Sequence, residues 1–262
     1  MCTVVILRRP GYDWPLILAA NRDEMADRPW RAPGRHWSER AEVTAGRDEL
    51  AGGTWLGLND WGVISGVLNR PESLGPDPEL RSRGELPLDA LDHAEAAIAA
   101  EAMAAIDPQS YRSFNLVITD AREAFWLCSK GGGEAVRMAP VPEGLSMLTA
   151  HDLNDTTSAR IRHFLPLFEA APAPDPETGE WYHWQALMGS RGKERTGEKE
   201  TGPESGPEGA MTLAAKTGFG TVSSSLLALP GPARTNGPGA IKPVWLFAPG
   251  PPDETPYGAV DL

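Results

Sequence analysis

The second residue of the chain, Cys2, is the side chain with the clearest capacity for chemistry. It follows the initiator methionine, and a methionine that precedes a small residue such as cysteine is normally trimmed by cellular aminopeptidase. Removal of Met1 would place a thiol and a free amine on one residue. The amine, which titrates at about pH 7.7–8.0, can then act as the base for its own thiol nucleophile. The competing interpretation is a small apolar residue at the head of a strand.

A second group of chemically capable residues is the tetrapeptide Asn21-Arg22-Asp23-Glu24. A carboxylate here could hold an amino-terminal amine in place. The Arg22 guanidinium could lower the pKa of a thiol or bind a substrate anion. The alternative is a polar turn with a surface ion pair, which contributes little to stability.

Three further side chains are candidates for binding or catalysis. Asn69 follows a short apolar run, and a strand-end asparagine amide can donate a hydrogen bond to a developing oxyanion. The alternative interpretation of Asn69 is a turn residue before Arg70. His151 lies beside Asp152, but neighbours on a strand face opposite sides, so we expect at most one of them in a site. Among the nine tryptophans, Trp55 is expected to contact a substrate, as are Glu24 and His151.

The elements that must position these groups can be read from hydrophobic spacing. Residues 3–7 and 15–20 predict an antiparallel hairpin with Cys2 at the head of its first strand and the tetrapeptide where the second strand ends. This pairing would bring residues 20–24 close to residue 2. Other segments predict strands at 52–58, 63–68, 113–120, 124–128, 145–150, 219–229 and 241–247, and helices at 85–106 and 157–168. Grouped hairpins and helices favour segregated sheets and helices over alternating βαβ units.

Composition excludes several functions. Lysine and arginine number 24 and aspartate and glutamate 36, so the net charge is −12, which disfavours nucleic-acid and anionic-lipid partners. No apolar stretch approaches the roughly 20 residues that span a bilayer. Two cysteines predict free thiols in a reducing, cytoplasmic compartment. Since no His/Cys cluster has metal-ligand spacing, we expect no metal and no cofactor. Residues 190–209 lack large apolar side chains and predict a disordered excursion.

The order of several short motifs resembles a known family. The tetrapeptide is preceded by Met1-Cys2-Thr3, and the remaining motifs follow it in the family's order. They are Arg28-Pro29, Gly52-Gly53-Thr54-Trp55-Leu56-Gly57, Asn69, Ser82-Arg83-Gly84-Glu85-Leu86, Phe114-Asn115-Leu116-Val117 and Phe219-Gly220-Thr221. This pattern is similar to the NRDE family, which includes the transport and Golgi organisation type proteins. The resemblance covers most of the chain.

The resemblance implies a fold and a reaction. The fold is an α+β, four-layer αββα sandwich of two mainly antiparallel sheets, as in N-terminal-nucleophile hydrolases, and it would span residues 1–262 as a single domain. Choloylglycine hydrolases and penicillin V acylases are the nearest functional parallel, and they cleave linear, non-peptide amides. The similarity assigns Cys2 as nucleophile, Asp23 as support for the amine and Asn69 as oxyanion donor. Arg22 and Asn21 support them.

Two departures from the family pattern bear on activity. Ala150 stands where relatives carry an asparagine of the hydrolase site, and Val222 stands where they carry an arginine. Both losses favour an alternative in which the chain is a non-catalytic binding or trafficking protein. Its ligand would then be a hydrophobic compound such as heme or an acyl compound. A third hypothesis is a structural or interaction role without an enclosed pocket beside residue 2.

Overall fold

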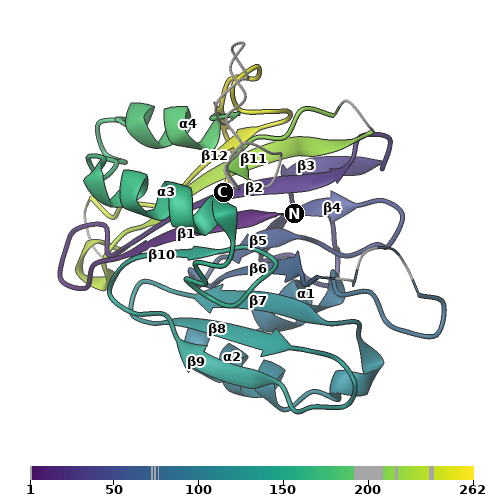
Figure 1. Cartoon of the computed structure of the whole chain (residues 1–262). Helices are drawn as coiled ribbons and strands as arrows, with labels where there is room; N and C mark the ends of the chain where they lie inside the picture. Colours follow the sequence, from purple (N-terminus) through teal and green to yellow (C-terminus); the bar gives the residue numbers. More distant parts are fainter. Residues whose placement is uncertain are drawn as a thin grey trace, which may run out of the picture.

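The computed structural model describes residues 2–71, 73, 75, 77–191, 209–215, 218–235 and 239–262. Residues 192–208, which make up most of the excursion predicted at 190–209, lie outside the described residues. The described elements form two antiparallel sheets with helices on the outer face of each (Figure 1).

The first sheet carries the amino terminus of the chain. Its six strands run in the order β10 (Gly144–Leu148), β1 (Thr3–Arg8), β2 (Leu16–Met25), β11 (Phe219–Leu229), β12 (Val244–Ala248) and β13 (Gly258–Ala259). The predicted hairpin of β1 and β2 is confirmed, with Thr3 opposite Asn21. The predicted pairing of the last two long strands, β11 and β12, is confirmed as well.

The second sheet faces the first across the centre of the molecule. Its seven strands run in chain order: β3 (Trp30–Gly34), β4 (Val43–Asp48), β5 (Leu56–Asn59), β6 (Ile64–Asn69), β7 (Phe114–Thr119), β8 (Ala124–Ser129) and β9 (Arg137–Pro140). The hairpins predicted for β5 with β6 and for β7 with β8 are confirmed. Strands β3, β4 and β9 are additions that hydrophobic spacing did not indicate, because each is short and carries exposed or polar residues.

Helices cover the outer face of each sheet, which completes four layers (Figure 1). Helices α1 (Glu85–Leu91) and α2 (Ala96–Ala104) pack on the second sheet, and α3 (Ala159–Ala170) and α4 (Tyr182–Met188) pack on the first. The expected αββα sandwich is therefore confirmed. Side chains alternate between faces along each strand, so the central strands β1, β2, β7 and β8 contribute both to a helix-facing core and to the core between the sheets.

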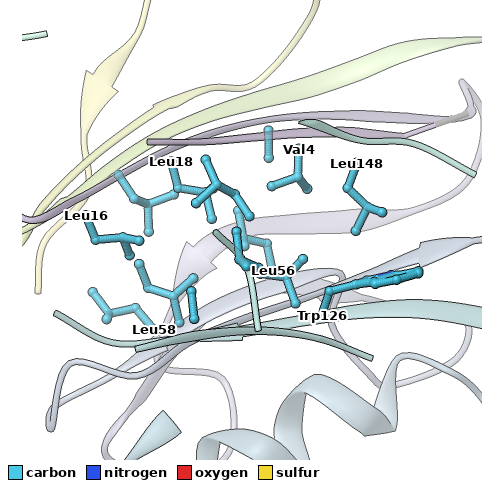
Figure 2. Close-up of a cluster of buried hydrophobic side chains, with 14 of the residues drawn as sticks. Val4, Leu16, Leu18, Leu56, Leu58, Trp126 and Leu148 are labelled. Carbon is cyan, nitrogen blue, oxygen red and sulfur yellow. The ribbon is translucent and has the colours of Figure 1, made fainter. Parts of the chain in front are cut away.

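The core between the sheets is formed mainly by aliphatic side chains from facing strands. Figure 2 shows Val4, Leu16 and Leu18 of the first sheet meeting Leu56 and Leu58 of the second. Each of these side chains is at least nine-tenths buried. Removing apolar surface from water is the main favourable term in folding, so burial of this layer stabilises the packing of the two sheets against each other. The functional groups discussed below lie at one end of it.

The helix predicted over residues 85–106 is interrupted. It forms the separate helices α1 and α2, because side chains from the sheet hold the connection between them open. The Asn59 amide donates to the carbonyls of Leu91 and His93, at 2.9 and 2.8 Å. The Asp120 carboxylate accepts from the Ala96 N–H at 3.0 Å, at the start of α2. These partners satisfy helix-end groups that would otherwise be unpaired, so the sheet ends one helix and begins the next.

Candidate active site

The Cys2 sulfur lies beside the tetrapeptide. Cys2 immediately precedes β1 and is partly buried, and its thiol donates to the Asp23 carbonyl with 3.7 Å between sulfur and oxygen. The tetrapeptide itself lies inside β2 rather than at the end of a strand as predicted. Strand β11 pairs along β2 as far as Met25, which extends β2 by five residues beyond the predicted end at Ala20. The proximity expected from the hairpin is nevertheless present.

A small cavity opens next to Cys2, between the two sheets. Its volume is about 20 Å³, which is room for about one water molecule. The lining residues come from β1, β2, β5, β6 and β11 and from the segments beside them: Cys2, Thr3, Val4, Ala20, Asn21, Arg22, Trp55, Leu56, Gly66, Val67, Leu68, Ser223 and Ser225. Four of the predicted residues, Cys2, Asn21, Arg22 and Trp55, therefore meet at one cavity.

Arg22 and Trp55 form one wall of this cavity. The Arg22 side chain is only 5% exposed, and its guanidinium lies over the Trp55 ring, 4.1 Å from the ring centre. Such stacking of a cation on an aromatic face is stronger where water is excluded. The indole is held against Gly46, where an added Cβ would come within 2.3 Å of the ring. Glycine at position 46 therefore lets Trp55 lie flat beneath Arg22.

Charged groups around Arg22 fix its orientation but leave one nitrogen free. Its Nη2 lies 3.3 Å from Asp48 and 4.0 Å from Glu24, and Asp48 also accepts from Arg28 at 2.6 Å. Burial opposes ionisation of Asp48, but the hydrogen bonds from Arg28 and the Ala51 N–H outweigh it and lower the pKa of Asp48. The Arg22 Nη1 atom is buried and has no hydrogen-bond partner among the described residues. A buried donor without an acceptor is an unfavourable state that a ligand oxygen would relieve.

The Asp23 carboxylate faces the opposite side of β2, towards the helices. It accepts from the Thr221 hydroxyl at 2.7 Å and from Arg160 of α3 at 3.2 Å. The same Arg160 nitrogen also donates to the Thr3 hydroxyl. Thr221 in turn accepts from the Leu213 N–H at 2.8 Å. This buried network joins β1, β2, β11 and α3 directly behind Cys2.

Asn21 also faces the helices. Its amide nitrogen donates to the carbonyls of Met188 and Met211, at 3.0 and 2.9 Å, so it anchors the end of α4 and the segment before β11. The register of β11 against β2 shifts between Thr221 and Ser223, which makes Val222 the extra residue of a bulge. Bulges commonly redirect side chains next to functional sites. Across this bulge, Thr221 donates to the Asp23 carboxylate on the helix-facing side, whereas Ser223 lines the cavity.

Besides Asp23, three predicted residues are absent from the cavity lining. Asn69 is the last residue of β6, is partly exposed and pairs with Phe114, and it is not among the lining residues. His151 is partly buried in the segment after β10, and its carbonyl accepts from Asn115 at 2.7 Å. Glu24 is partly buried, and its carboxylate lies 3.9 Å from Arg28. The structure thus brings Cys2, Arg22 and Trp55 together and leaves Asn69 and His151 outside the lining.

The environment of Cys2 disfavours its thiolate. Burial raises the pKa of the thiol, and the negative charge of Asp23 acts in the same direction, whereas Arg22 acts against it. The thiol is therefore protonated at neutral pH, and a nearby base is needed before it can attack a carbonyl carbon.

Several residues of this site were missed by sequence reasoning. Arg160 sits in a helix whose spacing shows only an apolar face, so nothing in the sequence marks it. Thr221 falls within a quoted family motif, which is the signal that could have found it. Asn115, another motif residue, is fully buried and joins Arg70, Trp126 and the segment after β10.

The four-layer αββα fold of this chain is the architecture found in N-terminal-nucleophile hydrolases. The N-acylethanolamine-hydrolyzing acid amidase ortholog of Caenorhabditis elegans superposes with a TM-score of 0.54, at 12% identity, over 86% of this chain and 92% of that one. The C2A mutant of the conjugated bile acid hydrolase of Clostridium perfringens superposes with a TM-score of 0.54, at 11% identity, over 100% and 92% of the two chains. At these identities the likeness shows the fold alone.

The chain belongs to the Transport and Golgi organisation 2 family, whose model matches residues 1–196. The Transport and Golgi organization protein 2 homolog of Bos taurus is 35% identical over 141 residues, and the Mus musculus homolog is 30% identical over 141 residues. Each match covers 50% of this chain and 50% of the relative. The chain thus spans about half the length of the curated relatives it matches.

Two features are absent from the described residues. Within them, no helix is both long enough and apolar enough to cross a bilayer. Over the same part of the chain, histidine, cysteine and acidic side chains do not gather in groups of three that could hold a metal ion.

Proposed function

We propose that this chain is an N-terminal cysteine amidohydrolase that cleaves a non-peptide linear amide once Met1 has been removed. The observation that carries the proposal is the place of the Cys2 sulfur, 3.7 Å from the Asp23 carbonyl and at a cavity that Arg22 also lines. The fold shared with an amidase and a conjugated bile acid hydrolase supports the same reaction class.

The reaction begins with a proton transfer on Cys2 itself. The free α-amine takes the thiol proton, and the sulfur forms a bond to the amide carbonyl carbon. The carbon–nitrogen bond then breaks, and the proton passes from the ammonium to the departing amine. Water attacks the resulting thioester, with the amine again taking a proton, and releases the carboxylic acid and the thiol. The raised pKa of the thiol explains why the amine is required as a base.

The tetrahedral intermediate needs a donor for its oxyanion. Arg22 Nη1 suits this role because it is buried beside the cavity and has no hydrogen-bond partner among the described residues. A preorganised donor aimed at developing charge is often the largest single contribution to catalysis. The assignment of Asn69 to the same role stays a prediction, which an Asn69→Ala variant tests directly.

Asp23 acts in this proposal as a positioning residue. Its carbonyl accepts from the thiol, and its carboxylate is held by Thr221 and Arg160 on the far side of β2. The backbone next to the sulfur is therefore fixed from three elements, which keeps the nucleophile within reach of the cavity.

The alternative of a hydrophobic ligand such as heme has less support. The cavity beside Cys2 measures about 20 Å³, whereas pockets for drug-sized ligands measure about 300–1,000 Å³. A heme titration of the Cys2→Ala variant, followed by absorbance, tests this alternative. Heme binding that persists without the Cys2 thiol would favour it.

The test of the proposed reaction compares free and blocked forms of Cys2. The chain is made as a fusion with a protease site directly before Cys2, so that cleavage exposes its amine and the uncut fusion keeps it blocked. Fluorogenic coumarin amides with acyl chains of graded length serve as substrates. We expect turnover only after cleavage, a mass increase of one acyl group on Cys2, and loss of turnover by orders of magnitude in Cys2→Ala.

The second thiol provides the matched control. Cys128 is buried on β8, and Cys128→Ala should leave turnover unchanged. Equal turnover by the uncut fusion, or by Cys2→Ala, would reject the proposal.

A further inference from the structure

We propose that Arg83 binds an acidic group of the substrate at the mouth of the Cys2 cavity, so that the preferred amide carries a carboxylate near its scissile bond. The inference rests on the proposed function, because it assigns a substrate class to the same cavity. It concerns a residue that takes no part in the steps described above.

The contacts of the Arg83–Gly84 turn place it beside the segment that leads into Trp55, a lining residue of the cavity. The Thr54 N–H donates to the Gly84 carbonyl at 2.8 Å, next to Trp55. Gly53 and Gly84 lie so close that a Cβ on Gly53 would come within 2.4 Å of the Gly84 backbone. The two glycines thus hold the turn directly against the segment that supplies the Trp55 wall.

The guanidinium of Arg83 reaches the other wall, at the ends of β6 and β7. Its Nη1 donates to the Ser113 carbonyl at 3.1 Å, and Ser113 directly precedes β7. It also donates to the Ser73 hydroxyl at 2.7 Å, and this hydroxyl in turn donates to the Arg70 carbonyl at 2.7 Å. Arg70 lies two residues beyond Leu68, a lining residue of the cavity. Arg83 therefore spans the edge between Trp55 and Leu68.

Arg83 has no acidic partner in the part of the chain that the structure describes. Both of its hydrogen-bond acceptors are neutral, and both contact the same nitrogen, Nη1. Its neighbours differ, because Arg81 pairs with Glu85 at 2.5 Å and Arg112 pairs with Asp77 at 3.3 Å. A half-buried cation without a counter-ion is unusual in a chain whose net charge is −12.

Among the described residues near the cavity, one positive charge has no acidic partner. Arg22, Arg28 and Arg83 face two acids, Glu24 and Asp48, and both acids already contact Arg22 and Arg28. Burial, and then the nearby charge of Arg112, lower the pKa of Arg83 to about 10, so it stays protonated at neutral pH. The negative charge of Glu24 acts in the opposite direction and favours the cation. The rim is thus suited to one additional anion.

The size of the cavity determines which part of a substrate meets Arg83. A space of about 20 Å³ admits the reacting carbonyl group and little else, so the remainder of the substrate lies across the mouth. A guanidinium offers paired N–H donors that match a carboxylate in geometry as well as charge. An acid a few bonds from the amide would meet Arg83 while the carbonyl meets Arg22 Nη1.

Paired substrates test this inference. N-decanoylglycine carries its acid on the amine side of the amide, and the decylamide of succinic acid carries it on the acyl side. Each is compared with its methyl ester on the protein with free Cys2. We expect one acid to be preferred over its ester, and the preferred compound tells which side of the amide faces Arg83.

Variants of Arg83 separate charge recognition from structural damage. In Arg83→Gln we expect kcat/KM for the acid to fall about 10- to 100-fold, mainly through KM, with the ester unaffected. Arg83→Lys should restore part of the preference because it restores the charge. Arg81→Gln, which removes a neighbouring exposed arginine, should leave the ratio unchanged. The same acid-to-ester ratio in the parent chain and in Arg83→Gln would overturn the inference while leaving the hydrolase proposal intact.

A binding measurement covers the case in which no amide is hydrolysed. That outcome would reject the proposed function, and the Cys2→Ala protein is then titrated with each acid and each ester by calorimetry. Binding of an acid, absent for its ester and lost in Arg83→Gln, would support the anion site. Equal binding of acid and ester, or no binding of either, would reject it.

Discussion

Arg160 of α3 and Asp23 of β2 form a buried ion pair, with 3.2 Å between guanidinium nitrogen and carboxylate oxygen. The two side chains are 3% and 0% exposed, so the pair lies outside the reach of solvent screening. The same Arg160 nitrogen binds the Thr3 hydroxyl, one residue beyond Cys2. One guanidinium therefore determines how β1, β2 and α3 meet behind the candidate nucleophile.

Breaking this ion pair should be strongly destabilising. In Arg160→Met the buried Asp23 carboxylate loses its ion pair with Arg160, and we expect the free energy of unfolding to fall by about 3–5 kcal/mol. Urea denaturation followed by circular dichroism measures the change. The exposed pair of Arg35 and Asp60 is the matched control, since its side chains are 41% and 56% exposed. A loss in Arg160→Met no larger than that in Arg35→Met would contradict the expectation.

Replacing Thr221 tests the hydrogen bonds that hold Asp23 from β11. Thr221→Val keeps the side-chain volume but removes the donor to Asp23 and the acceptor of the Leu213 N–H. Because both partners stay buried, we expect a loss of about 1–3 kcal/mol in the free energy of unfolding. Thr221→Ser, which keeps the hydroxyl, should recover most of it. A loss in Thr221→Val no larger than that in Thr221→Ser would contradict the role given to the hydroxyl.

The lowered pKa of Asp48 predicts that the stability contributed by its ion pairs with Arg22 and Arg28 is lost in acid. Burial opposes its ionisation, but the hydrogen bond and charge of Arg28 prevail, so the folded-state pKa lies below the unfolded value of about 3.9. The stabilisation is complete above that unfolded value and is lost as pH falls through the folded pKa. We expect Asp48→Asn to be less stable than the parent at pH 7 and to show a flatter loss of stability below about pH 4. Thermal unfolding scans at pH 7 and below about pH 4 measure the stability of the parent and of Asp48→Asn. The same dependence of stability on pH in both proteins would contradict the expectation.

Alkylation of Cys2 should report the state of its amine. Burial raises the pKa of the thiol, so in the uncut fusion iodoacetamide should react slowly at pH 7 and faster above the ordinary cysteine pKa of about 8.5. Cleavage before Cys2 supplies an adjacent amine, and we expect the rate profile to shift to lower pH. Peptide mass spectrometry on the Cys128→Ala background isolates the reaction of Cys2. Identical profiles before and after cleavage would remove the amine from the mechanism.

Much of the fold could be predicted from hydrophobic spacing and motif order. The β1–β2 hairpin follows from β-branched runs around a turn-rich segment, and its pairing placed the tetrapeptide beside Cys2. The helix break after Leu91 could not be read in the same way. It depends on the Asn59 amide, which comes from a strand 32 residues earlier in the chain.

The candidate site, like the fold, could be predicted only in part from the sequence. The amino-acid sequence by itself determined the residue types, the order of the motifs and the hairpin that joins Cys2 to Arg22 and Asp23, because these depend on short-range pattern. Only the tertiary structure decided which way each side chain faces. The extension of β2 along β11 directs Asp23 to Arg160 and Arg22 to the cavity, and β6 ends with Asn69 outside the lining. Strand alternation makes such facing depend on partners distant in the chain, which no local pattern records.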